Sequence, residues 1–582
     1  MKKSYFLFIG ACALLVGCKH TMSPVISLNQ VGFAPMQEKT ATIALDKKSE
    51  ISNQKSEIFI LNASRDTVWR GESSETMYNP VSGKPRQIVD FSDLTTPGTY
   101  TLYANTGRSI VNCQLSINHR PYRELTRAAL RAYYHQRASM ATEEPYAEGY
   151  ARPAGHPDDQ VLVHASAATA ERPEGTVISS SGGWYDAGDY NKYIVNSGYT
   201  MGVWLMAYEM NRAYYDTLHL NIPEPDAPMP DMLSEAMYNL RWMMTMQDTD
   251  GGVYHKLTEP DFEGFIRPDQ CKKPRYVVMK TTAAALDFAA TMALAARVYA
   301  PYDSAFCAEA REAALRAYAW ALGSPDIYYD QPRMNEQFQP AITTGAYDDF
   351  DVRDEFFWAA TELYLLTGDD AFREMSIIHD QLSTDYIPAT WGNVAELAYL
   401  EFLMHPEANA NTNANALLAH LAPYLDEAET VSVYRSPYGN RENDFFWGCN
   451  SEGCCWRGVE CLYAYRLTGD EKYRLNAERC LNYVLGQNAT GYCYVTGFGA
   501  RPTSHPHHRL SYSHAKGTLP GFLAGGPNPA KQDYYSDGVK YPKDVPADES
   551  YLDYQPSYAS NEVTINWNVT LFALTAGLDA LE

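Results

Sequence analysis

The pattern of hydrophobic and polar positions divides the chain into two parts. Between residues 24 and 118, short runs of alternating apolar and polar residues are separated by turn clusters such as Thr96-Pro97-Gly98. This spacing predicts a small all-β sandwich, with strands near 42–45, 58–61 and 100–103. After Pro121 the apolar residues recur at helical spacing, and we expect helices over 123–140, 227–247, 281–300 and 308–322.

The helical part contains an internal repeat. Residues 357–369 and 455–470 each carry an aromatic-rich helix that ends in Leu-Thr-Gly-Asp and is followed by a second helix. Repeated helix pairs form either an open solenoid or a closed ring. The loops between the pairs are long and rich in aromatic and charged residues, which favours a ring with a cleft on one rim. We predict a mainly α protein, with an (α/α)6 barrel over residues 121–582.

The N-terminus reads as a bacterial export signal. Lys2 and Lys3 precede an apolar run over residues 5–16, which is too short for a permanent membrane helix. Leu15-Val16-Gly17-Cys18 is typical of a lipobox, although a plain secretory signal with a chance cysteine is the alternative. We expect residues 1–17 to be a signal peptide, lipid on Cys18, a linker over 18–23, and anchoring to the bacterial outer membrane. The orientation, cell surface or periplasm, stays open.

The charge narrows the class of substrate. The formal net charge of −24 excludes nucleic acid and anionic polymers as favoured partners, because such a field repels phosphate and uronate. A neutral glycan meets no such repulsion. Among the aromatic residues, Trp184, Trp391 and Trp447 lie in polar, loop-like stretches, and we predict that their rings stack on sugars.

One glycine-rich turn carries two carboxylates. Asp186 and Asp189 stand three residues apart in Gly182-Gly183-Trp184-Tyr185-Asp186-Ala187-Gly188-Asp189. Glycine permits backbone conformations that could aim both carboxylates at one water molecule. A surface Asx-turn or a calcium loop has a similar composition, but a solvated turn has little use for so many aromatic neighbours.

A carboxylate that activates water needs a partner acid across the bond that is cut. Glu562 stands where a polar stretch meets the apolar run 569–581, which we expect to be a final buried helix. Partial burial favours the protonated form of a carboxyl group and suits a general acid. A helix N-terminal charge is the alternative, and the two roles are compatible.

These stretches resemble glycoside hydrolase family 9, the inverting cellulase-type enzymes. The turn with Asp186 and Asp189, the histidine-containing stretch 495–509 and the C-terminal acid stretch around Glu562 match the family in order. Residues 26–33 and 93–100 resemble the immunoglobulin-like module that precedes many of its catalytic domains. The resemblance implies Asp189 as base, Asp186 as its helper and Glu562 as acid. It also implies that His507 and Asp553 belong to the catalytic residues, and that Tyr185, His255, Arg509 and Tyr558 contact the sugar chain.

Three places in the sequence bear on metal binding. Asp351, Asp354 and Glu355 offer hard oxygen ligands, and relatives hold a structural calcium in a comparable loop; a solvated helix start is the alternative. Some relatives bind zinc through a Cys-His pair, but Gly155 stands in place of that cysteine before His156, so we expect no zinc. Cys449, Cys454, Cys455 and Cys461 could suggest zinc, yet their helical setting favours buried free thiols. The chemistry itself requires no cofactor.

Two classes of function remain. The first is an inverting endo-hydrolase of β-1,4-glucosidic bonds in soluble glucans such as xyloglucan, with an exo-acting glucosidase or glucosaminidase as the variant within catalysis. The second is a silent glycan-binding lipoprotein, against which the presence of all three carboxylates speaks. We expect the protein to be a monomer.

Overall fold

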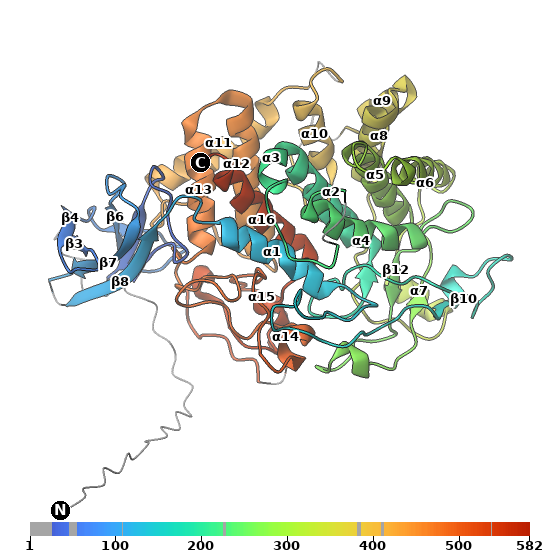
Figure 1. Ribbon diagram of the computed structural model, residues 1–582, viewed down its shortest axis with the longest axis horizontal. Helices are drawn as coiled ribbons and strands as arrows, with labels where there is room; N and C mark the ends of the chain where they lie inside the picture. Colours follow the sequence, from blue (N-terminus) through green and yellow to red (C-terminus); the bar gives the residue numbers. More distant parts are fainter. Residues whose placement is uncertain are drawn as a thin grey trace, which may run out of the picture.

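The computed structural model describes residues 26–45, 55–107, 109–224, 228–380, 386–408, 412–536 and 538–582. Figure 1 shows a small β-sandwich beside a large helical body. Cys18 and the export signal lie outside the described residues. Among the helices of the described residues, none is both long and apolar enough to cross a membrane.

The sandwich consists of two antiparallel sheets. The first has the order β1 (Ile26–Ser27), β2 (Thr40–Ala44), β6 (Pro85–Asp90) and β5 (Met77–Tyr78). The second has the order β4 (Thr67–Glu72), β3 (Glu57–Leu61), β7 (Gly98–Asn105) and β8 (Ile110–Ile117). Alternate residues point inward, so Ile43, Val89, Ile58, Leu102 and Ile117 form a common core. The predicted strands are therefore present.

The helical body is the predicted barrel. Its inner helices are buried over most of their length: α2 (Ile194–Met210), α5 (Thr282–Val298), α8 (Arg353–Thr367), α10 (Ala395–Met404), α12 (Trp456–Thr468) and α16 (Ile565–Asp579). The outer helices bury one face: α1 (Arg123–Gln136), α4 (Asp231–Thr245), α6 (Ser304–Gly323), α9 (Asp370–His379), α11 (Asn415–Thr430) and α13 (Glu471–Val484). Shorter helices are α3 (Arg212–Tyr215), α7 (Gln331–Gln337), α14 (Arg509–Ser513) and α15 (Tyr558–Asn561). Because the inner helices are largely enclosed, they are not divided into an apolar and a polar face, and even acids such as Glu362 and Glu460 are buried on them.

The internal repeat corresponds to the helix pairs α8–α9 and α12–α13. Each first helix ends at a left-handed glycine, Gly368 with φ 71° and Gly469 with φ 68°. The aspartates that follow, Asp369 and Asp470, then accept a backbone N–H of the next helix. The Thr-Gly-Asp sequence is thus a C-cap joined directly to an N-cap, which fixes each helical hairpin locally.

A small sheet organises the loops at one end of the barrel. Its strands are β10 (Val177–Ile178), β9 (Val161–Val163), β13 (Tyr276–Val277), β12 (Lys256–Thr258) and β11 (Lys192–Tyr193), in that order. Strand β11 follows the aspartate-containing turn directly and pairs antiparallel with β12. This pairing brings the turn beside the loop that follows residue 258.

The sandwich packs against the barrel through polar side chains that are buried between them. Asn29 donates a hydrogen bond to Asn482 over 2.8 Å, and Gln487 bonds to Thr40. Arg479 of α13 forms an ion pair with Glu38. These contacts fix the sandwich against α13 and the segment that follows it.

Candidate active site

The turn that carries Asp186 and Asp189 is shaped by close packing. Gly182 and Gly183 have φ values of 88° and 76°, and a Cβ on Gly183 would lie 2.6 Å from the Trp242 ring. The backbone N–H of Asp186 donates to the carbonyl of Asn191, which closes the turn before β11. Glycine is required here by both the backbone angles and the neighbouring ring.

The two aspartates have different hydrogen-bond environments. Asp186 accepts from Asn196 through Oδ1 and from Tyr347 through Oδ2, each over 2.6 Å. Asp189 accepts from Asn191 and Tyr193 through Oδ2 alone, over 2.6 and 2.9 Å. Its Oδ1 is buried and has no hydrogen-bond partner among the described residues. Asp189 therefore keeps one carboxylate oxygen with which to accept a proton from a bound water.

Burial and mutual repulsion set the charge on this pair. Burial raises the pKa of Asp186, and the neighbouring Asp189 adds to the rise. Burial also raises the pKa of Asp189, but there the Arg509 cation and the donors on Asn191 and Tyr193 oppose it. A negative charge is thus better compensated on Asp189, which is the requirement for a general base.

Glu562 lies in the loop between α15 and α16. Its segment pairs with His507 in a short parallel bridge, and its carboxyl Oε1 would be 3.0 Å from a Cβ placed on Gly188. The residue is half-buried at the cleft, and the desolvation of its carboxyl group, together with the charges of Asp189 and Asp186, raises the pKa of Glu562 to about 8. A carboxyl group that keeps its proton at neutral pH can act as a general acid.

The three carboxylates line one cleft with a volume of about 400 Å³. Trp391 and Trp447, two of the predicted sugar platforms, lie on its walls, and 40% of Trp447 is exposed. Tyr558 packs against Trp447 with ring centroids 5.3 Å apart. The cleft therefore combines acids with flat aromatic faces, which suits a chain of neutral sugar rings.

Three predicted sugar contacts were wrong. Trp184 is fully buried, and its indole N–H donates to Glu235 over 2.9 Å. Tyr185 is also fully buried, with its hydroxyl at 2.9 Å from Nδ1 of His156. His255 is 1% exposed and uses its ring nitrogens on Thr281 and the carbonyl of Ala346. Polar neighbours had suggested that Trp184 is exposed, whereas Tyr185 and His255 were chosen from the family resemblance; packing buries all three.

Three other predicted residues support the turn and the loop beside Glu562. Arg509 donates to the carbonyls of Gly188 and Glu263 and is buried. Asp553 accepts the backbone N–H groups of Ser504 and His505. His507 donates from Nδ1 to the Gln555 carbonyl over 2.9 Å. A carbonyl oxygen can only accept, so Nδ1 carries the proton and Nε2 of the neutral ring is an acceptor. These contacts indicate positioning roles for Arg509 and Asp553.

The structure also adds residues that the sequence did not single out. Glu452, in a π-helical turn over Asn450–Cys455, lines the cleft together with Asn566 and Trp567. Burial raises the pKa of Glu452 to about 7. In the structure, the π-helical turn marks this position, because such turns often occur at functional sites. No sequence pattern predicted the turn.

The expected calcium ligands are partly corrected. Asp351 is exposed and forms an ion pair with Arg353, so its selection was wrong. Asp354 and Glu355 are buried, and Asp287 of α5 and Asp349 join them. Both carboxylate oxygens of Asp287 and of Glu355 lack hydrogen-bond partners among the described residues. Burial raises the pKa of Glu355 well above its usual range, and the carboxylates of Asp354, Asp287 and Asp349 add to the rise. Such a group of bare oxygens fits a hard cation.

The clustered cysteines are buried free thiols, as predicted. Cys449, Cys454, Cys455 and Cys461 are all buried and unbridged. Cys449 and Cys454 direct their thiols to the backbone carbonyls of Pro527 and Cys480. They therefore act as small core residues.

Comparison with known proteins gives the same picture. Residues 122–575 match the profile described as "Glycosyl hydrolase family 9", and residues 21–109 match "Cellulase N-terminal ig-like domain". The chain is 47% identical to a xyloglucan-specific endo-β-1,4-glucanase of Bacteroides ovatus, over 98% of this chain and 96% of that protein. It is 30% identical to a cellulose 1,4-β-cellobiosidase of Acetivibrio thermocellus, over 96% of this chain and 68% of that protein.

Solved structures of similar proteins have the same fold. A Bacteroides ovatus structure superposes with a TM-score of 0.88 at 45% identity, covering 96% of this chain and 99% of that one. A thermostable endoglucanase of Alicyclobacillus acidocaldarius superposes with a TM-score of 0.82 at 30% identity, covering 96% of this chain and all of that one (100%).

Proposed function

The chain belongs to glycosyl hydrolase family 9, and from this premise we propose that it cleaves internal β-1,4 bonds of soluble, neutral plant glucans with inversion. Xyloglucan is the first substrate to test, since a relative with 47% identity is named for it. Mixed-linkage glucan and amorphous cellulose are the other candidates. The negative net charge of −24 supports a neutral polymer.

In the proposed mechanism, Asp189 and Asp186 hold one water molecule beneath the sugar whose bond is cut. Asp189 removes a proton from this water through its unpartnered Oδ1 as the oxygen attacks the anomeric carbon. Glu562 gives its proton to the leaving oxygen of the neighbouring sugar. Attack on the face opposite the leaving group inverts the anomeric configuration.

The observation that carries this proposal is the contrast between the two aspartates. Both oxygens of Asp186 are occupied by protein donors, whereas Asp189 has a bare buried oxygen in the cleft that Glu562 also lines. Proton NMR of the first product tests it. The α-anomer should appear first; a β-anomer would contradict water activation by Asp189.

Two hollows support endo action. Besides the cleft with the carboxylates, a second hollow of about 600 Å³ lies beside His505 and Pro506, with the exposed rings of Tyr512 and Tyr554 on its wall. Tyr512 packs on Phe265, which also packs on His507. A polymer could thus bind on both sides of the cleavage point. Xyloglucan viscosity should fall well before many reducing ends appear; steady release of one small sugar at constant viscosity would instead indicate exo action.

We further propose that the carboxylates of Asp287, Asp349, Asp354 and Glu355 hold a structural calcium ion. The support is the bare oxygens of Asp287, Asp349 and Glu355, whose carboxylates would otherwise repel one another within the barrel. The ion takes no part in the mechanism. Calcium removal should lower thermal stability before it changes the cleavage chemistry.

The cellular location and the oligomeric state of the protein are proposals as well. We propose lipid attachment at Cys18, anchoring in the outer membrane, and a monomeric catalytic chain. Cys18→Ala should move the protein from the membrane fraction to the soluble fraction without changing its specific activity. Unchanged fractionation would contradict the anchor, and size-exclusion chromatography of the purified chain tests the monomer.

A further inference from the structure

A buried asparagine joins the two aspartates of the catalytic turn. Asn191 directly precedes β11 and is fully buried. Its backbone carbonyl accepts the N–H of Asp186 over 3.0 Å, and its side-chain Nδ2 donates to Oδ2 of Asp189 over 2.6 Å. A single residue therefore holds the backbone of one aspartate and the carboxylate of the other.

The oxygen of the same amide settles which way the amide faces. Oδ1 of Asn191 accepts the backbone N–H of Glu259 over 2.8 Å, and Nη1 of Arg275 donates to it over 3.4 Å. Both partners can only donate, so the oxygen must face them. The NH2 group is consequently turned toward Asp189, and a flipped amide would set two donors against each other at Glu259.

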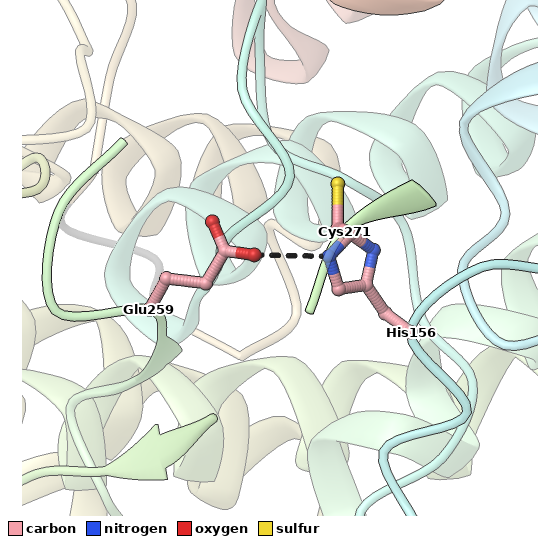
Figure 2. A group of neighbouring side chains, drawn as sticks. All are labelled: His156, Glu259 and Cys271. Carbon is pink, nitrogen blue, oxygen red and sulfur yellow. Dashed lines mark hydrogen bonds and ion pairs between the residues drawn. The ribbon is translucent and has the colours of Figure 1, made fainter. Parts of the chain in front are cut away.

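The two donors on this oxygen are themselves fixed from the far side. Glu259 is fully buried, and its Oε1 lies 3.0 Å from Nε2 of His156, as Figure 2 shows. Arg275 donates to both carboxylate oxygens of Asp158 over 3.0 and 3.3 Å. The loop over residues 259–275 thus presents its donors in a set direction, and this direction fixes the amide of Asn191.

The amide in turn fixes the carboxylate of the general base. Asn191 and Tyr193 both donate to Oδ2 of Asp189, which holds that oxygen from two directions. The other oxygen, Oδ1, then has a set direction, and it is the bare oxygen of a residue that lines the cleft. A hydrogen bond to an ionised carboxylate also stabilises its charge. Asn191 thus affects both the aim and the charge of the base.

The charges around the base make each neutral donor count. The titratable groups that interact with Asp189 are Asp186, Tyr193, Lys256, Glu259, Tyr347, Arg509 and Glu562. Burial raises the pKa of Asp189, Arg509 opposes this rise, and Glu259 adds to it. Because the neighbouring carboxyl groups oppose the charge on Asp189, a lost donor on Oδ2 should make this group easier to protonate.

We propose that Asn191 is a positioning residue for the general base: it directs Oδ1 of Asp189 toward the bound water and keeps the carboxylate charged. The loop over residues 259–275 holds Asn191 in this orientation. The inference rests on the proposed inverting mechanism, in which Asp189 removes a proton from water. An amide suits the position because it offers a donor on one side and an acceptor on the other.

The pH dependence of kcat/KM in Asn191→Leu tests this role. Leucine keeps the branched shape of asparagine and removes both its donor and its acceptor. The substrate should be an aryl β-cellobioside with a nitrophenol leaving group, which needs the base but little help from the acid. In the variant, activity should be lost on the acidic side about 1–2 pH units higher than in the unchanged chain, because the charged carboxylate has lost a hydrogen bond. Near neutral pH the rate should fall less than it does in acid.

Two further variants keep the test decisive. Asn191→Ala adds no bulk and should shift the acidic limb in the same direction. The matched control is Asn482→Leu, which changes a buried asparagine that accepts from Asn29 at the sandwich interface. It should lower the melting temperature and leave the acidic limb in place.

The outcomes separate this proposal from the mechanism on which it rests. A folded Asn191 variant with an unmoved acidic limb, or an equal shift in Asn482→Leu, would overturn the positioning role. Loss of folding in both Asn191 variants would show that the residue serves the fold, and would overturn it as well. Release of the β-anomer first by the unchanged chain would instead refute the inverting mechanism itself.

Discussion

Gly188 gives the sharpest test of how the catalytic turn is held. A Cβ at this position would lie 2.2 Å from the carbonyl oxygen of His507 and 3.0 Å from Oε1 of Glu562. The first distance is about 1 Å short of ordinary van der Waals contact, and the obstacle is backbone, which cannot rotate away. Gly188→Ala must therefore push the turn away from the Glu562 loop.

The expected losses of stability and of catalytic rate in Gly188→Ala follow from the size of this displacement. Overpacking of a well-filled interior costs about 1–3 kcal/mol of stability. A shift of about 1 Å between catalytic groups costs about 100-fold in rate. The carbonyl of Gly188 also accepts two hydrogen bonds from Arg509, which would be distorted as well. We expect turnover of xyloglucan to fall about 100-fold with a modest loss of stability.

The matched control is Gly264→Ala. Gly264 lies in the loop after β12, and a Cβ there meets nothing within 4 Å. Initial rates, KM and the melting temperature should be measured for both variants and for the unchanged chain. The rate should fall in Gly188→Ala alone. If Gly188→Ala kept the normal rate and melting temperature, the described contact between the turn and the His507 segment would be refuted.

Four further predictions concern charge and stacking. Glu562→Gln should abolish cleavage of polysaccharides but retain cleavage of substrates with good leaving groups. On those substrates, the pH profile of the variant should no longer show the loss of activity near pH 8, where the Glu562 carboxyl of the unchanged chain gives up its proton. Asp189→Asn should abolish cleavage of both kinds of substrate. Remaining activity on either of them would mean that another residue is the base. Because burial raises the pKa of Asp287, the metal-free fold is most stable when this carboxyl is protonated and loses stability as the pH rises. Calcium should restore the lost stability. Asp287→Asn should weaken both the pH effect and the calcium effect in thermal melts, since Glu355 still titrates in the same cluster. Trp447→Ala should raise KM for xyloglucan and change kcat less. The expected loss of binding free energy is about 1–3 kcal/mol, as for other contacts in which an aromatic side chain stacks on a ring. An unchanged KM would mean that Trp447 does not contact the substrate in the cleft.

Much of the architecture could be predicted from the sequence, because it depends on interactions between residues that are close in sequence. The strands of the sandwich follow from alternation, since one face of each sheet is buried. The hairpins α8–α9 and α12–α13 follow from Thr-Gly-Asp, because a left-handed glycine and a capping aspartate act within one turn of chain. The turn with Asp186 and Asp189 was recognisable because its glycines and carboxylates are adjacent in sequence.

The tertiary structure alone decided which side chains reach the cleft. Trp184 and Trp447 both stand in polar stretches, yet one is enclosed by the barrel and the other is 40% exposed, because burial depends on elements distant in sequence. Asp287 lies in the wholly buried helix α5, where no periodicity marks a functional face. Only the closing of the ring brings it to Glu355. Sequence patterns report the surroundings of a residue over a few positions, whereas these sites are assembled across roughly a hundred residues, where packing decides.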